Sequence, residues 1–211
     1  MARTDKKLDQ IVTNVPTAAI IGNGKSRLGY DLARFSPVGI DVYGCNALYR
    51  EFSDISYPVP NWIVAVDNDM IAEIQSSNFP ASRLLVPPPD ECWEPAECNP
   101  CRPRMNAGMA AMKFAIVAGN KRLYCLGFDF LILDQMLSLS NIYDGTPNYG
   151  PATRANASDT PSRLHFLEWF MTQHKDVEFV FILPENVIVY QLFAKNATSV
   201  SIEEFSRRHV I

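Results

Sequence analysis

Several short clusters of residues have types and spacings suited to binding a ligand. The first is Gly22-Asn23-Gly24-Lys25-Ser26, a glycine turn that follows an apolar run and precedes a helical pattern. Backbone N–H groups at the start of a helix attract a phosphate, and glycines let that phosphate approach closely. The turn therefore predicts an anion-binding site, although an ordinary tight turn between a strand and a helix has the same composition.

The same turn permits a nucleoside-triphosphate interpretation. Ala19-x-x-x-x-Gly24-Lys25-Ser26 fits a relaxed phosphate-loop pattern, with Asp67 as a magnesium-binding acid. A phosphate loop needs its first small residue after the strand has ended, whereas Ala19 lies inside the apolar run. A P-loop-like nucleotide kinase is therefore kept as a second alternative only.

Two further clusters follow the second and third apolar runs. Asn46 has an amide that can give and accept hydrogen bonds, as a sugar or a base edge requires. Capping a short helix over Ala47–Glu51 is an equally good role for it. Asp67-Asn68-Asp69 offers two carboxylates for a metal or a ribose, but capping the following helix is the favoured interpretation.

The last two clusters lie farther along the chain. Arg104, Asn106, Ala107 and Gly108 combine a cation, a capping amide and a glycine at a helix start, which again favours an anion. Asp129 follows the fifth apolar run, where its carboxylate can orient a ligand hydroxyl. No histidine, serine and aspartate are arranged as a nucleophilic site.

Six apolar runs must position these clusters. They are nearly continuous in apolar residues, as in strands that are covered on both faces. The runs are Thr17–Ile21, Ile40–Tyr43, Trp62–Val66, Arg83–Val86, Lys121–Leu126 and Val177–Leu183. Helical patterns alternate with them over Lys25–Phe35, Asp69–Gln75, Asn106–Ala118, Ser162–His174, Glu185–Ala194 and Ile202–Arg208.

This alternation predicts an α/β fold with a doubly wound, mainly parallel, Rossmann-like sheet in a single domain over residues 1–211. Such sheets bind ligands beyond the carboxyl ends of the strands, at the point where the strand order reverses. The irregular stretch 131–160 begins directly after a strand end and is too long for a simple connection. We expect it to be a lid of loop and helix.

Composition narrows the class of protein. The chain has 211 residues, 47% of them hydrophobic, and a net charge of −4, which argues weakly against nucleic-acid binding. No apolar run is long enough for a membrane span. The N-terminal charges are followed by no apolar stretch, so we expect no secretory signal and a cytoplasmic protein with reduced cysteines. Cys92, Cys98 and Cys101 lack the full spacing of a zinc site, and loop thiols are the favoured interpretation.

Taken in order, these segments resemble the bacterial CMP-sialic-acid-dependent sialyltransferases that modify lipooligosaccharide. Ala19-Ile-Ile-Gly-Asn-Gly-Lys-Ser26 is similar to the opening Gly-Asn-Gly motif of the family, and Ile40-Asp-Val-Tyr-Gly-Cys-Asn46 to its second strand. Arg104-Met-Asn-Ala-Gly108 and Leu126-Gly-Phe-Asp-Phe130 are similar to its central helix start and following strand end. A looser resemblance is to 6-hydroxymethylpterin pyrophosphokinase-like proteins.

The resemblance implies a site for a CMP-linked sugar, with three departures from the family pattern. Ala107 replaces a serine, Leu131 replaces a phosphate-contacting tyrosine, and no histidine precedes the closing helix as a general base. Tyr143 or Tyr149 is a candidate for the phosphate contact, and Asp159 for the base. The expected ligand contacts are Gly22, Asn23, Gly24, Lys25, Ser26, Asn46, Asn106, Ala107, Gly108, Asp129, Tyr143 and Tyr149, with catalytic roles for Arg104 and Asp159.

The resulting hypothesis is an inverting, metal-independent glycosyltransferase that needs no cofactor. Its partners are a nucleotide-sugar donor, of which a CMP-linked one is favoured, and an unknown acceptor; a homo-oligomer is left open. The alternative is a catalytically inactive binding or assembly protein on the same fold, because a fold by itself does not carry a function.

Overall fold

The computed structural model describes residues 15–52, 60–151 and 157–208. Seven strands form one sheet in the order β4-β3-β2-β1-β5-β6-β7, and all six neighbouring pairs are parallel. The order runs outward in both directions from β1 and β5, which confirms the expected doubly wound, Rossmann-like α/β fold. The strands are β1 (Thr17–Ile21), β2 (Asp41–Cys45), β3 (Trp62–Val64), β4 (Leu84–Leu85), β5 (Arg122–Leu126), β6 (Glu178–Leu183) and β7 (Ala197–Ser201).

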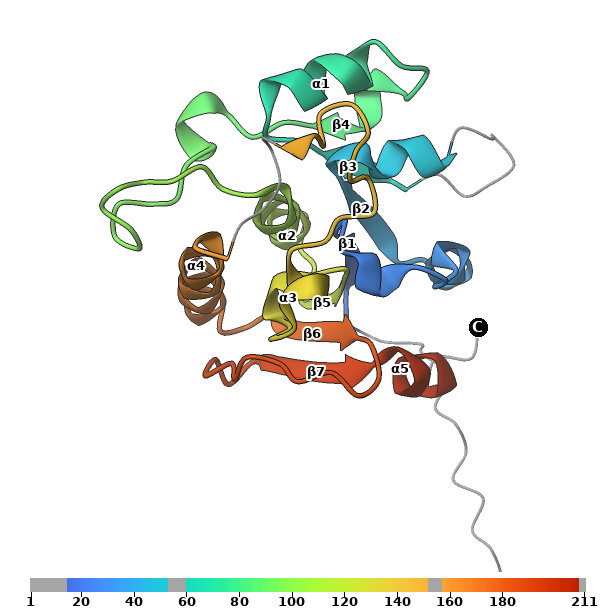
Figure 1. Ribbon diagram of the computed structural model, residues 1–211. Helices are drawn as coiled ribbons and strands as arrows, with labels where there is room; N and C mark the ends of the chain where they lie inside the picture. Colours follow the sequence, from blue (N-terminus) through green and yellow to red (C-terminus); the bar gives the residue numbers. More distant parts are fainter. Residues whose placement is uncertain (1–14, 53–59, 152–156, 209–211) are drawn as a thin grey trace, which may run out of the picture.

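Helices cover both faces of this sheet. Along the chain they are α1 (Asn68–Gln75), α2 (Ala107–Val117), α3 (Gln135–Ser138), α4 (Asp159–Gln173) and α5 (Ile202–Arg208). Shorter 3₁₀ turns are η1 (Lys25–Arg27), η2 (Leu32–Val38), η3 (Asn46–Phe52), η4 (Ala81–Arg83), η5 (Pro89–Glu91) and η6 (Asp129–Leu131). Figure 1 shows α2 and α4 on one side of the sheet and α5 on the other.

Alternate side chains of the central strand enter two hydrophobic cores. Ala18 and Ile20 belong to the core that includes residues of α2 and α4. Ala19 and Ile21 belong to the core that includes residues of α1, η2 and α5. Because successive side chains of a strand point to opposite faces, a run without polar residues must be covered on both sides.

The expected helix over Glu185–Ala194 is wrong, and β7 after it was not expected. The segment instead lies along the chain that follows β5, with Leu133 N donating to Ile188 O at 2.9 Å and Tyr190 N donating to Leu131 O at 2.9 Å. These bonds use backbone groups that a helix would satisfy internally. Tertiary pairing therefore outweighs the helical pattern here.

The expected helix over Lys25–Phe35 is also wrong. Two 3₁₀ turns, η1 and η2, stand in its place, and Gly29 between them has a φ of +85°. A residue in this left-handed region interrupts a right-handed helix. The closing helix α4 begins at Asp159, three residues before the expected start at Ser162.

The stretch expected to form a lid holds η6, α3 and an irregular segment. We call residues 139–150 the strap, because Figure 1 shows this segment running from α3 past the ends of the central strands towards α1. Ile142 N donates to Asn23 O at 2.9 Å, and Asn141 forms an isolated bridge with Gly24. The strap is therefore fastened to the carboxyl end of β1. Residues 152–156 of the expected lid lie outside the described residues.

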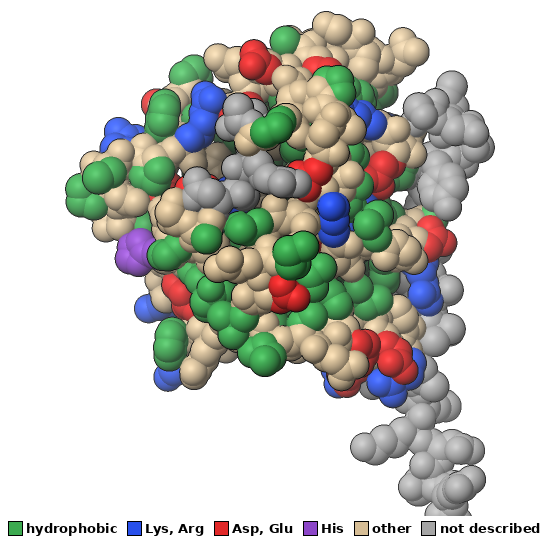
Figure 2. Space-filling model, in the orientation of Figure 1, with side chains coloured by type: hydrophobic (Ala, Val, Ile, Leu, Met, Phe, Trp, Pro, Cys, Tyr) green, Lys and Arg blue, Asp and Glu red, His purple; other side chains and the backbone are tan. Residues whose placement is uncertain are grey.

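The surface in Figure 2 mixes basic and acidic side chains, and hydrophobic side chains gather over α3 and β6. In the described ranges, no helix has the length and apolar character that crossing a bilayer requires. The five cysteines form no disulfide. Nor do three His, Cys, Asp or Glu side chains of the described residues meet in a metal-binding group, so Cys92, Cys98 and Cys101 do not assemble a zinc site there.

Candidate functional site

A cavity of about 740 Å³ lies where the central strands end. Its walls come from the loops after β1, β2, β3 and β5, from the start of α2, from the strap and from α4. This is the edge at which the strand order reverses, and the volume is in the range of small-molecule sites. The expected contacts that line it are Gly22, Asn23, Gly24, Asn46, Arg104, Asn106, Ala107, Gly108, Asp129 and Tyr149.

Three of the amides in the glycine turn donate hydrogen bonds within the chain. Gly22 N donates to Leu126 O at 2.8 Å, and Gly24 N donates to Gly127 O at 3.1 Å. Ser26 N donates to the carboxylate of Asp129 at 2.8 Å. These three donors therefore already have acceptors within the chain and are not available to an anion, so the expected phosphate site at this turn would depend on the other two amides.

Asp129 is held by the same contacts. Its carboxylate accepts hydrogen bonds from both the backbone and the hydroxyl of Ser26. Burial raises the pKa of Asp129, while the Ser26 hydrogen bonds and the Arg27 charge oppose that rise. The carboxylate therefore fastens the first turn to the end of β5, and its expected role towards a ligand hydroxyl is not supported.

Lys25 and Ser26 are not among the lining residues. The ammonium of Lys25 lies 3.7 Å from a carboxylate oxygen of Asp144 on the strap. A phosphate-loop lysine must instead reach a bound phosphate. The geometry of this turn therefore gives no support to the kinase interpretation.

The two asparagines meet as expected, but through a tyrosine of the strap. Asn23 Nδ2 donates to the Tyr149 hydroxyl at 2.9 Å. Burial raises the pKa of Tyr149 to about 12, against the opposing hydrogen bonds of the Ala47 backbone and the Asn46 side chain. The Oδ1 atoms of Asn23 and Asn46 are buried without a hydrogen-bond partner among the described residues. The three side chains thus form one wall of the cavity.

The start of α2 forms a second wall. Asn106 caps this helix, since its Oδ1 accepts from Met109 N at 3.0 Å, as the sequence predicts. Ala107 N and Gly108 N have no acceptor among the described residues, and both residues line the cavity. Unsatisfied N–H groups and the helix dipole make this end of α2 electropositive.

Arg104 adds a full positive charge beside that helix start. Its guanidinium lies 3.5 Å from the Asp67 carboxylate and 5.5 Å from the centre of the Trp93 ring. More than a third of the side chain is exposed, and the ion pair is long. Arg104 is therefore weakly engaged within the chain and faces the cavity.

Arg163 is a lining residue that the sequence analysis missed. It lies on the second turn of α4, a helix that begins at the same edge of the sheet. The signal was present, because a helix that leads into a parallel strand starts at the carboxyl edge of the sheet. The expected helix over Ser162–His174 already placed Arg163 in its first turn, so the sequence carried this signal.

Tyr143 and Asp159 do not line the cavity. The Tyr143 hydroxyl donates to Glu51 and accepts from Arg27 at 3.1 Å. Asp159 is the first residue of α4, and its carboxylate lies 4.0 Å from the guanidinium of Arg163. Neither residue is therefore among the described residues that line the cavity.

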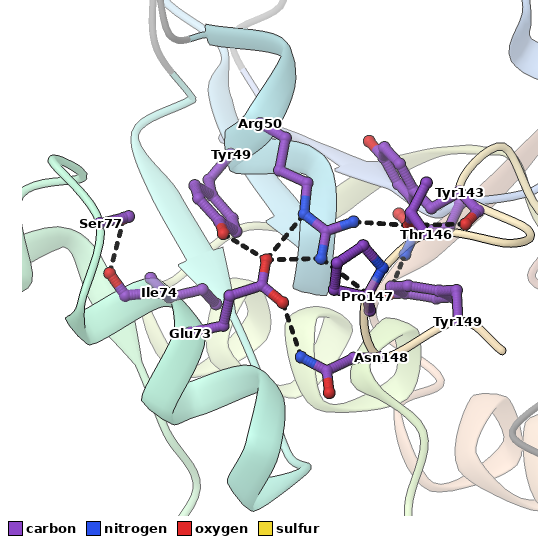
Figure 3. Close-up of polar contacts among 11 residues, drawn as sticks. Tyr49, Arg50, Glu73, Ile74, Ser77, Tyr143, Thr146, Pro147, Asn148 and Tyr149 are labelled. Atoms are coloured by element: carbon purple, nitrogen blue, oxygen red, sulfur yellow. Dashed lines mark hydrogen bonds and ion pairs between the residues drawn. The ribbon is translucent and has the colours of Figure 1, made fainter.

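A clamp that the sequence did not reveal holds the strap over the cavity (Figure 3). The guanidinium of Arg50 pairs with Glu73 at 2.5 Å and donates to Thr146 Oγ1 at 2.7 Å and to Pro147 O at 2.9 Å. Asn148 Nδ2 donates to the other oxygen of Glu73 at 2.6 Å. One arginine thus joins η3, α1 and the strap.

Comparisons of the chain with protein-family models, with curated proteins and with solved structures find no match.

Proposed function

We propose that the protein binds a nucleotide-activated sugar in the cavity and transfers the sugar to an acceptor. The observation that carries this proposal is the mixed character of one ligand-sized cavity. Arg104, Arg163 and the start of α2 supply positive groups, whereas Asp67 and Asp69 supply exposed carboxylates. A nucleotide sugar has both a phosphate for the first group and hydroxyls for the second.

The preference for a CMP-linked donor comes from the sequence resemblance. Transfer of its sugar requires stabilisation of the departing phosphate, which preorganised positive groups provide without rearranging. Arg104 and the free amides at the start of α2 lie at one wall and suit this role. The reaction that we propose is an inverting, metal-independent glycosyl transfer, in which these positive groups replace a metal ion at the departing phosphate.

A binding protein without catalysis is the second candidate, and two observations favour it. Leu131 is 1% exposed in the hydrophobic core and makes no wall of the cavity. Asp159, the candidate base, is not a lining residue either. A general base must reach the proton that it removes. In the second candidate function, the protein therefore binds the nucleotide sugar but does not transfer it.

Titration calorimetry with CMP, UMP, GMP and ATP, with and without magnesium, tests the proposal. We expect CMP to bind without magnesium and more tightly than the other nucleotides. Release of CMP from a CMP-linked sugar in the presence of glycan acceptors then measures transfer, and binding without release supports the second candidate.

Two results would contradict the proposed function. One is that no nucleotide binds. The other is that ATP binds only with magnesium and loses its binding in Lys25→Ala, which supports the kinase interpretation instead.

A further inference from the structure

Arg163 differs from the other arginines near the ends of the strands in how its charge is compensated. Arg27 donates two hydrogen bonds to Glu51, at 2.6 and 3.1 Å. Arg50 pairs with Glu73 at 2.5 Å. Arg163, in contrast, has only the Asp159 carboxylate at 4.0 Å as an ion-pair partner among the described residues.

The direction of the pKa shift of each arginine agrees with this difference in geometry. Burial alone lowers the pKa of an arginine, but hydrogen bonds and charge from Glu51 and Glu73 raise the pKa of Arg27 and Arg50. For Arg163, burial lowers the pKa, and the charge of Asp159 only partly opposes this change. Its side chain is partly buried, with 34% of it exposed, and its guanidinium has no close carboxylate among the described residues.

Lys25 and three amides of the first turn are less available to a ligand in the cavity. Lys25 points to Asp144 and is not a lining residue, and the amides of Gly22, Gly24 and Ser26 have acceptors within the chain. Among the described lining residues, the arginines are Arg104 and Arg163. Both lie where an anion of the ligand can neutralise them.

We propose that Arg163 is a binding residue for a phosphate of the ligand, acting with Arg104 in the same cavity. A guanidinium presents a planar fork of donors that matches a phosphate, and such charge-assisted hydrogen bonds are about twice as strong as neutral ones. The inference deepens the proposed function and rests on it for the nucleotide. It assigns to Arg163 the phosphate contact for which the sequence suggested Tyr143 or Tyr149.

The test compares ligands that differ in phosphate. Calorimetry measures binding of CMP, cytidine and inorganic pyrophosphate to the full chain and to Arg163→Gln. We expect the variant to bind CMP at least about tenfold more weakly and cytidine unchanged, because a lost charge-assisted hydrogen bond costs about 1.5–3 kcal/mol and 1.4 kcal/mol is tenfold. Pyrophosphate binding should fall with that of CMP.

The chain offers a matched control in Arg207→Gln. Arg207 forms a similar pair one helical turn from its carboxylate, Glu203, at 3.9 Å, but on α5 and away from the lining residues. Its variant should bind all three ligands as the unchanged chain does. Circular dichroism of each variant shows whether it is folded. A second variant, Arg163→Lys, keeps the positive charge but not the planar fork of donors. It should bind CMP about threefold to tenfold more weakly than the unchanged chain.

The outcomes separate this inference from the proposed function. Unchanged CMP binding by Arg163→Gln, or by Arg163→Lys if the first variant does not fold, overturns the role of Arg163 and leaves the proposed function standing. An equal loss of CMP and cytidine binding also overturns it. If the unchanged chain binds pyrophosphate through Arg163 but no nucleotide, the phosphate contact stands and the proposed function fails. If it binds none of the three ligands, both fail.

Discussion

At the scale of single residues, Glu94 is a buried carboxylate whose hydrogen bonds are incomplete. Its side chain is 5% exposed, and one carboxylate oxygen has no hydrogen-bond partner among the described residues. Burial raises the pKa of Glu94, although a hydrogen bond from Asn99 and the charge of His165 oppose this rise. The ionised form is therefore less favourable in the folded chain than in the unfolded chain.

The sign of the resulting pH dependence follows from this raised pKa. The stability from protonated Glu94 is present below its unfolded pKa and is lost as the pH rises through the folded value. We expect Glu94→Gln to be about 1 kcal/mol more stable than the unchanged chain at pH 7, because a neutral amide replaces a buried, unsatisfied charge. Urea unfolding at pH 4 and pH 7 measures this difference, which should shrink at pH 4.

Glu97→Gln is the control for that measurement. Glu97 lies in the same loop but is exposed, so its substitution should change the free energy of unfolding by less than about 0.5 kcal/mol. A Glu94→Gln variant that is less stable than the unchanged chain at pH 7 would show that the carboxylate is better satisfied than the geometry indicates.

At the scale of elements, the clamp between Arg50 and Glu73 decides whether the strap stays closed. Tyr49, Arg50 and Asn148 all donate to Glu73 (Figure 3). Burial by itself would raise the pKa of Glu73. These hydrogen bonds and the Arg50 charge together lower the pKa by more than burial raises it, so the net shift is downward. The clamp therefore joins three separate elements most strongly when Glu73 is ionised.

We expect Glu73→Gln to release the strap without unfolding the sheet. Losing charge-assisted hydrogen bonds costs about 1.5–3 kcal/mol, so amide hydrogen exchange in residues 143–149 should accelerate by roughly tenfold or more. The exchange of β1 amides should stay unchanged. Mass spectrometry of exchanged peptides measures both regions, and Glu203→Gln on α5 is the control.

The same hydrogen-exchange measurement, repeated at several pH values, tests the ionisation of Glu73. Since the pKa of Glu73 is lowered in the folded chain, the clamp's contribution is present above the ordinary value of 4.5 and is lost as the pH falls through the folded value. After correction for intrinsic exchange rates, strap protection should decrease below about pH 4.5 in the unchanged chain and stay flat in Glu73→Gln. Equal protection in both proteins at every pH would exclude the clamp.

At the scale of the whole molecule, the chain approaches itself closely beside the cavity, where Gly22 follows β1 and Gly127 follows β5. A Cβ on Gly22 would lie 2.5 Å from the carbonyl oxygen of Gly127. That contact is with backbone, so a rotamer change cannot relieve it. The two central strands can therefore meet at this edge only if residue 22 is a glycine.

We expect Gly22→Ala to destabilise the whole molecule by about 2–3 kcal/mol, because the added methyl must push apart the centre of the sheet. Denaturant unfolding followed by tryptophan fluorescence and by circular dichroism should show the same shift in midpoint. Gly150→Ala is the matched control, since a Cβ there meets no atom of the described residues within 4 Å. A Gly22→Ala protein as stable as this control contradicts the role of the close approach.

The sequence by itself determined the doubly wound sheet and the edge that carries the cavity. Apolar runs such as Thr17–Ile21 must be covered on both faces, and the capping of α2 by Asn106 is local chemistry between near neighbours. Both depend on periodicity and on short-range contacts, which a single sequence displays directly.

Only the tertiary structure decided which polar groups remain available at that edge. Asp129 meets Ser26 across 103 positions, and Tyr149 meets Asn23 across 126. Whether a polar group faces a ligand or another residue depends on which acceptors the folded chain brings within about 3 Å of it. No local pattern carries that information, which is why the engagement of Ser26 by Asp129 and of Asn23 by Tyr149 could not be predicted.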